Sequence, residues 1–227
     1  MTHRPSARLA LLAVLVAASG AAAAADAPPA VDAAPAASAP TLIDGNVVRR
    51  IHGTGKLSVA REMALQCADE RRDADCQRYA GAYLLKGLGG PKDVERGMKY
   101  TRLAAQQGDA VAEAMLGRQY REGVGTAKDD TQALAWYEAS ARHCNTWAQN
   151  AVARAYADGD FVPADRTRAL FWISVAAHFL HPGAEAGVQV VQAQATPAER
   201  EAAKKLLDEF MAGTKCGKGM AVMNAAP

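Results

Sequence analysis

The strongest constraint on the fold of this chain is an internal repeat of 36 residues that begins near Asp75. Glycines recur at this spacing, and so do acidic, ring-bearing and small residues. The positions in register are Gly87, Gly123 and Gly159; Asp93, Asp129 and Asp165; Tyr100, Trp136 and Trp172; Gly97, Ala133 and Ala169; and Ala105, Ala141 and Ala177. A fixed period of this length indicates copies of one supersecondary unit that stack on each other.

The second copy indicates that this unit is a pair of helices. Apolar residues recur at steps of three and four between residues 111 and 122, which predicts an amphipathic helix. Gly123 can adopt the left-handed conformation that ends such a helix, and Asp129 or Asp130 can cap the next one, which runs to about Arg142. A single hairpin of this kind cannot bury its apolar face, so its stability must come from stacking.

The second copy also carries a specific motif. It is Leu116-Gly117-x-x-Tyr120-x-x-Gly123-Val124-Gly125, followed by Asp129, Ala133, Trp136-Tyr137 and Ala141. This motif resembles the Sel-one-like repeat (SLR), a relative of the tetratricopeptide repeat. The resemblance implies an all-α protein, a right-handed α/α solenoid of three helical hairpins at about residues 75–109, 110–145 and 146–182.

Two of the copies depart from the motif. The first has one extra residue between Tyr83 and Gly87, and the third has Phe161 where the second has its second glycine, Gly125. Both departures concern the shape of the loop between the two helices of a hairpin.

The regions on either side of the repeats are predicted to cap the stack. In residues 41–74, an amphipathic helix over 57–71 can cover the first hairpin. In residues 183–227, the run Thr196-Pro197-Ala198-Glu199 predicts the start of a capping helix, with an irregular tail after it. The segment from Thr41 to Gly53 is ambiguous, and Ile43 to Val47 could form a small hairpin.

The first 40 residues are predicted to be a targeting signal and a linker. Residues 1–25 begin with basic residues, continue with an apolar run and end in an A-x-A cleavage pattern. A transmembrane anchor is the alternative, but the strongly apolar residues stop at Val16. Residues 26–40 are rich in Ala and Pro, which predicts an extended linker. We expect cleavage near Ala25, a periplasmic or secreted protein, and no membrane insertion after cleavage.

Export would place the four cysteines in an oxidising compartment, where an even number favours disulfides. Four cysteines allow three pairings. We favour Cys67 with Cys76, because residues 69–75 form a polar turn between two helices, and Cys144 with Cys216, which would tie the tail to the body. A zinc site is disfavoured because no C-x-x-C pair or histidine cluster accompanies the cysteines.

Composition and motifs exclude several classes of function. The chain has 26 Lys and Arg against 24 Asp and Glu, which argues against a nucleic-acid binder. It has no nucleophile elbow, phosphate-binding loop, dinucleotide fingerprint or H-E-x-x-H motif. His178 and His181 could share a helix face as metal ligands, with His143 one repeat earlier, but the helix dipole also favours histidines at helix C-termini. We expect no enzyme activity, cofactor or metal.

A solenoid offers a surface for binding, and in the resembling families the first helix of each hairpin lines its concave side. Transferred by position, this implies a groove with four arginines and a tryptophan, residue types that dominate binding energy at interfaces. The predicted groove residues are Arg78, Met115, Arg118, Arg121, Trp147, Asn150 and Arg154. The alternative is that Trp147 packs against a neighbouring helix and the arginines are solvated.

The resemblance implies a non-enzymatic adaptor that binds another periplasmic or envelope protein or peptide in this groove. A structural protein that binds the cell wall or an exported polysaccharide is one alternative. A β-lactam-interacting protein is another, since some disulfide-rich members of the family have been linked to β-lactam binding.

Overall fold

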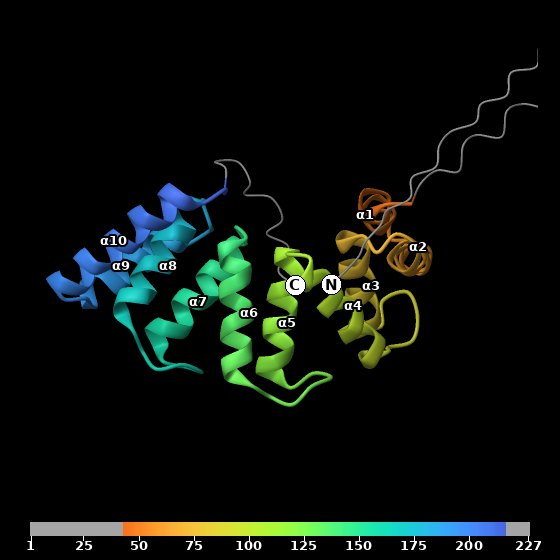
Figure 1. Ribbon diagram of the computed structural model, residues 1–227, viewed down its shortest axis with the longest axis horizontal. Helices are drawn as coiled ribbons and strands as arrows, with labels where there is room; N and C mark the ends of the chain where they lie inside the picture. The colour runs from red at the N-terminus through yellow and green to blue at the C-terminus, as the bar shows by residue number, and fades with distance from the viewer. Residues whose placement is uncertain (1–42, 217–227) are drawn as a thin grey trace, which may run out of the picture. The chain divides into compact units, whose positions relative to one another are not determined.

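The computed structural model describes residues 43–216, which form ten helices and no strand (Figure 1). The helices are α1 (Gly45–Gly53), α2 (Leu57–Glu70), α3 (Ala74–Lys86), α4 (Val94–Gln106), α5 (Ala110–Glu122), α6 (Asp130–Arg142), α7 (Thr146–Asp158), α8 (Arg166–His178), α9 (Ala184–Gln194) and α10 (Pro197–Gly213). Within residues 43–216, no helix combines the length and the apolar character needed to cross a membrane. The predicted signal, the linker and the tail from residue 217 onward lie outside the described residues.

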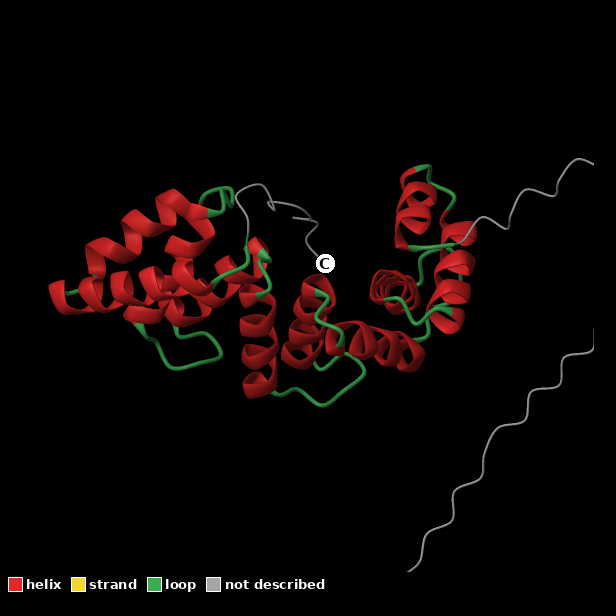
Figure 2. Ribbon diagram, turned by 45° about the horizontal axis from the view of Figure 1, so that its top comes forward, coloured by secondary structure: helices red, strands yellow, loops and turns green. Residues whose placement is uncertain are grey.

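The helices are arranged as three consecutive hairpins. Helix α3 packs on α4, α5 on α6, and α7 on α8, and the second helix of each hairpin also packs on the first helix of the next (Figure 2). This order of contacts is typical of a solenoid. The predicted all-α solenoid is confirmed.

In every copy a glycine ends the first helix and an aspartate caps the start of the second. Left-handed glycines follow the first helices at Gly87, Gly123 and Gly159, with φ of 69°, 71° and 66°. Glycine adopts this conformation without steric cost, which ends the helix. The N-caps of the second helices are Asp93, Asp129 and Asp165, whose side chains accept a hydrogen bond from the backbone N–H three residues later.

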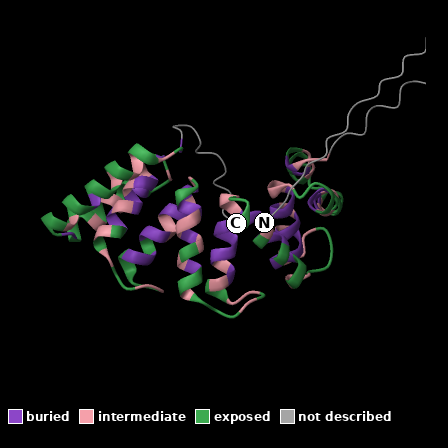
Figure 3. Ribbon diagram, in the orientation of Figure 1, coloured by how far each residue is buried: buried purple, intermediate pink, exposed green. Residues whose placement is uncertain are grey.

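Small residues let the two helices of a hairpin approach each other closely. A Cβ atom at Gly117 of α5 would lie 2.9 Å from a ring carbon of Tyr137 on α6. Ala133, Tyr137 and Ala141 of α6 are buried, and Figure 3 shows that buried residues gather where neighbouring helices meet. Tyr100 and Trp172 are buried as well and Trp136 is partly buried, so most of the repeated ring-bearing and small residues contribute to the core.

The N-terminal end of the described chain differs from the prediction. Residues 45–53 form helix α1 and not a small hairpin, because the Asp44 carboxylate caps the helix by accepting a hydrogen bond from the Val47 N–H. Helix α1 packs on α2 and α3 and buries Val48. A Cβ atom at Gly45 would lie only 2.3 Å from Cβ of Asp75, so the close approach of α1 to α3 requires glycine. Helix α2 is the predicted capping helix.

At the C-terminal end, two helices pack on α8. Helix α10 begins with the predicted capping box, in which Thr196 and Glu199 each accept a hydrogen bond from the other's backbone N–H. Phe210 of α10 contacts the rings of Phe171 and Trp172 on α8. Helix α9 also packs on α8, and this helix was not predicted from the sequence.

Both favoured disulfides are present. Cys67–Cys76 joins α2 to α3 and Cys144–Cys216 joins the turn before α7 to the segment after α10, with Cα–Cα distances of 5.7 and 5.5 Å. Asp73 lies close to the first pair, but sulfurs that are bonded to each other are not available as metal ligands. Two disulfides indicate a location outside the reducing cytosol.

Candidate functional site

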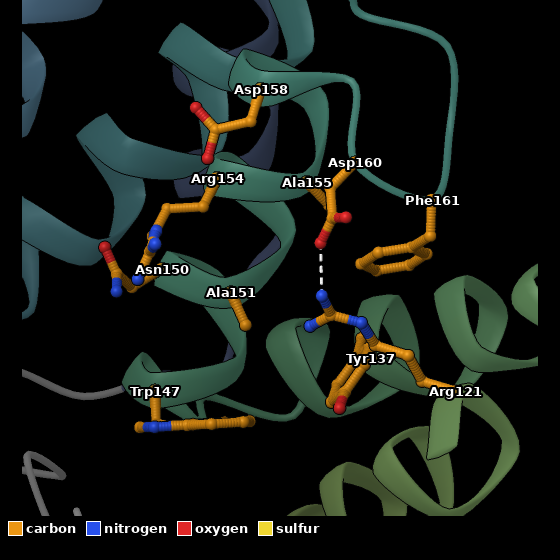
Figure 4. Close-up of a pocket in the computed structure, with 10 residues that line it drawn as sticks. All are labelled: Arg121, Tyr137, Trp147, Asn150, Ala151, Arg154, Ala155, Asp158, Asp160 and Phe161. Carbon is orange, nitrogen blue, oxygen red and sulfur yellow. Dashed lines mark hydrogen bonds and ion pairs between the residues drawn. The ribbon is translucent and has the colours of Figure 1, made fainter. Parts of the chain in front are cut away.

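Four of the seven predicted groove residues line a single hollow between the second and third copies. Its volume is about 190 Å³ (Figure 4). Helix α5 contributes Arg121, α6 contributes Tyr137, α7 contributes Trp147, Asn150, Ala151, Arg154, Ala155 and Asp158, and the loop after α7 contributes Asp160 and Phe161. The hollow therefore combines residues from two hairpins.

The hollow exists because the third copy has small residues where the second has large ones. Ala151 and Ala155 line the space. Met115 and Gln119 stand 36 residues earlier and are only 2% and 3% exposed. On α7, alanine replaces the large side chains that α5 has at these two positions, so the space remains open.

An aromatic wall encloses one side of the hollow. The centroid of the Tyr137 ring lies 6.0 Å from that of Trp147 and 6.2 Å from that of Phe161. Burial raises the pKa of the Tyr137 hydroxyl to about 12, although the charges of Arg121 and Arg118 act in the opposite direction. The phenol is therefore neutral near pH 7. Trp147 is only half-buried, so its ring can contact a bound group.

Phe161 belongs to this wall because it replaces a glycine of the repeat. Gly125 has the corresponding place in the second copy, with φ of 71°, and a Cβ atom there would lie 2.6 Å from Cγ of Met98. The loop of the third copy carries a ring instead, and the Arg121 guanidinium lies 4.8 Å from its centroid. Arg121 also forms an ion pair with Asp160. Arg121 thus connects the second hairpin to the loop of the third.

Three polar side chains of α7 complete the lining. Across residues 43–216, the side chains of Asn150, Arg154 and Asp158 have no hydrogen bond or ion pair with the protein. Figure 4 shows the Arg154 guanidinium beside the Asn150 amide, with Asp158 one turn further along the helix. These groups are available to a bound molecule as N–H donors and as a carboxylate acceptor.

The prediction of an open groove is wrong for Arg78 and Met115, which are both buried. The Nε atom of Arg78 donates a hydrogen bond to Asp109 at 2.9 Å, and a second guanidinium nitrogen pairs with Asp75. Burial by itself lowers the pKa of Arg78, but the two carboxylates together raise it above its ordinary value. Asp109 is also the N-cap of α5, so Arg78 joins the first copy to the start of the second.

Arg118 is half-buried and does not line the hollow. Burial and the charge of Arg118 lower the pKa of Lys86 on α3. The two cations are therefore near each other, on the side of α5 that faces the first copy.

Six residues of the hollow were not predicted from the sequence, namely Tyr137, Ala151, Ala155, Asp158, Asp160 and Phe161. A signal for Phe161 was present, because it interrupts the glycine pattern of the repeat. Tyr137 belongs to the motif, but its position in the motif does not reveal that it faces the next copy. Asp158 is the last residue of α7 and Asp160 lies in the loop after it, and no sequence pattern marks either acid.

The histidines have local partners. Both carboxylate oxygens of Glu113 lie within hydrogen-bond distance of His143 Nδ1, the shorter at 2.8 Å, and the Glu113 side chain is 4% exposed. Burial raises the pKa of Glu113, although the hydrogen bond with His143 lowers it in part. His181 Nδ1 lies 3.4 Å from the Thr146 hydroxyl.

The lining of the hollow is suited to binding. It offers aromatic faces, guanidinium and amide donors and one uncommitted carboxylate, and it contains no Ser, Cys, His or Lys. Acyl-transfer chemistry needs a nucleophile with an adjacent base, and the lining residues do not supply that pair.

The fold and the hollow define a helical-repeat protein with a recess between two of its copies. Comparison with known families matches the Sel1 repeat at residues 74–109, 110–143 and 148–178. The chain therefore contains three Sel1 repeats, as the motif implied. Proteins built from this repeat are generally protein-interaction modules.

The solved structures that are similar to this chain include two repeat proteins. A Sel1 repeat protein from Oxalobacter formigenes is 27% identical with a TM-score of 0.58, over 78% of this chain and 72% of that chain. A protective antigen from uropathogenic Escherichia coli strains, which displays an SLR fold, is 19% identical with a TM-score of 0.57, over 75% of this chain and 41% of that chain. The second likeness concerns the fold alone. No curated protein matches the chain.

Proposed function

We propose that this chain is a non-enzymatic periplasmic adaptor that binds a partner protein or peptide in the hollow between its second and third repeats. The observation that carries the proposal is the convergence of Arg121, Trp147, Asn150 and Arg154 on one recess. The two disulfides support a place outside the cytosol, and the predicted signal in residues 1–25 supports export.

The size and chemistry of the hollow favour part of a larger partner over a whole small molecule. Pockets for small molecules usually measure about 300–1,000 Å³, and this hollow has about 190 Å³. Such a space suits one side chain of a partner. Trp, Tyr and Arg are the residue types most enriched among those that dominate binding at interfaces.

The repeat itself supplies a variant that tests the proposal. Ala151→Met introduces the residue that the second repeat has at the same position, and its side chain should fill the hollow. The matched control is Ala157→Met, the same change at an exposed site of α7 outside the hollow. The measurement is affinity capture from periplasmic extract with each protein as bait, together with the melting temperature of each variant.

We expect the native chain and Ala157→Met to retain the same partner and Ala151→Met to lose it, with all three melting at similar temperatures. Retention of the partner by Ala151→Met would place its binding site elsewhere. The half-exposed face of Trp147, three residues before Asn150 on α7, also suits a sugar ring, so cell-wall or polysaccharide binding is the second candidate. Salt-sensitive co-sedimentation with isolated cell wall, without any captured protein, would favour this candidate.

A further inference from the structure

The second repeat shows which group fits the apolar half of the hollow. Met115 has on α5 the position that Ala151 has on α7, and its side chain is buried there. In the third repeat the corresponding space is open and lies against the rings of Tyr137 and Trp147. A flexible apolar side chain from a partner could occupy the place that methionine has in the second repeat, and aromatic rings favour such a neighbour.

The polar half of the hollow has one positive charge without a partner. Asp160 is paired with Arg121, whose guanidinium is also held over Phe161. Arg154 has no ionic partner within the described part of the chain, and Figure 4 shows the Asn150 amide beside it. A guanidinium and an amide that lie together favour a carboxylate, which can accept a hydrogen bond from each.

The remaining acid of the lining limits how much negative charge the hollow can accept. Asp158 lies one helical turn after Arg154 and is exposed and unpaired among residues 43–216. A second carboxylate beyond the first would approach Asp158 and be repelled. The lining is therefore suited to a single carboxylate and not to an extended polyanion.

We propose that the partner is a linear peptide segment in which an apolar side chain enters the hollow and the carboxylate of a neighbouring Asp or Glu pairs with Arg154. This rests on the proposed function, because it names the partner chemistry of the same site. A peptide is favoured over a saccharide because the open space corresponds to an amino-acid side chain, Met115, that the repeat itself provides elsewhere.

The test is a selection of random phage-displayed peptides on the full chain, purified with its disulfides intact. Parallel selections use Ala151→Met and Arg154→Glu. We expect the native chain to enrich peptides with an acid beside Met, Leu or Phe, and Ala151→Met to enrich none of them. Arg154→Glu should keep the apolar residue and replace the acid by Lys or Arg. In a synthetic copy of one selected peptide, changing its Glu to Gln should weaken binding by about tenfold.

The matched control is Arg102→Glu, a charge reversal at an exposed site of α4, which should leave the selected motif unchanged. Peptides that require Ala151 but carry no acid would overturn the carboxylate pairing and leave the proposed function intact. Peptides that bind Ala151→Met as well as the native chain would overturn both. Enrichment of no peptide would overturn the peptide proposal, and retention on a carboxylated polysaccharide that Ala151→Met abolishes would then identify a glycan as the ligand.

Discussion

The two junctions between the repeats occupy corresponding places but are closed to different degrees. At the first junction Arg78 pairs with Asp109, and the Met115 side chain is buried. At the second junction the corresponding residues are Ala114, Asn145 and Ala151. The second junction therefore lacks the ion pair and the large side chain of the first, and it contains the hollow instead.

This difference shows that the repeat does not need the ion pair in order to stack. The second junction is held by packing between α6 and α7 and by a large apolar cluster that includes Tyr137, Val152 and Trp172. Asn145 replaces Asp109 as N-cap of the next helix and donates a hydrogen bond to the Ala110 carbonyl. We infer that the residues at the first junction mainly stabilise the fold. Some side chains at the second junction are not needed for folding and are available for binding.

The largest expected effect is that of Arg78→Ala at the first junction. This change leaves the carboxylate of Asp109 buried without its cation, while the Asp75 carboxylate is half exposed and can be solvated. Removing one partner of a buried ion pair costs about 3–5 kcal/mol, and we expect about 3 kcal/mol here because Asp75 is solvated. The measurement is the free energy of unfolding by denaturant titration.

The control for this prediction is Arg154→Ala at the second junction. Arg154 is exposed and has no ionic partner in the described residues, so its removal should change the unfolding free energy by less than about 0.5 kcal/mol. Equal losses of unfolding free energy in Arg78→Ala and Arg154→Ala would show that the first junction does not depend more strongly on its arginine than the second.

A smaller effect is expected from Met115→Ala, which gives the first junction the small residue of the second. Truncating a buried methionine costs about 2–5 kcal/mol, and we expect about 2 kcal/mol because the third repeat already has alanine, Ala151, at the corresponding position. The measurement is again denaturant unfolding. A loss below about 0.5 kcal/mol would mean that Met115 does not fill the junction.

The regular parts of the molecule could be predicted from the sequence because they depend on local spacing. The 36-residue period predicted where the hairpins lie. Glycines that end helices and aspartates that cap them predicted the helix ends, as at Gly123 and Asp129. The burial of Arg78 could not be predicted, because it depends on a carboxylate 31 residues away that is also a helix cap. Helix α9 has few sequence signals, because its N-cap residue is Gly183, which has no side chain to cap the helix.

The hollow was predictable only in part. Position within the repeat identified Arg121, Trp147, Asn150 and Arg154 as neighbours, because residues on one face of successive helices recur with the period. The space exists because Ala151 and Ala155 have small side chains, and the ring of Phe161 lines it from the loop after α7. Both are exceptions to the repeat, so a pattern that averages the copies hides them.

A further comparison between corresponding positions concerns buried polar residues. Gln77, Glu113 and Gln149 stand 36 residues apart and are all buried. Gln77 accepts a hydrogen bond from Gln107, and Glu113 instead pairs with His143. Only the second repeat therefore buries an acid at this place.

The smallest predicted effect is that of Glu113→Gln, which gives the second repeat the residue of the other two. Burial raises the pKa of Glu113 above its ordinary value of 4.5, so the folded chain keeps a proton that the unfolded chain releases as the pH rises. The contribution of this group to stability is therefore greatest below pH 4.5 and is lost as the pH rises through the raised pKa. Relative to the native chain, Glu113→Gln should therefore become more stable as the pH rises from 4 to 8.

Denaturant unfolding of both proteins across this pH range measures the difference, and Gln77→Glu is the reciprocal control. The new acid would lie where Gln77 is 3% exposed and could still accept the hydrogen bond from Gln107. Its stability relative to the native chain should therefore fall as the pH rises, opposite in sign to Glu113→Gln. The opposite result would be a loss of stability in Glu113→Gln, relative to the native chain, as the pH rises. It would mean that the ion pair of Glu113 with His143 stabilises the fold by more free energy than the burial of the Glu113 carboxylate costs. The acid found only in the second repeat would then stabilise that repeat.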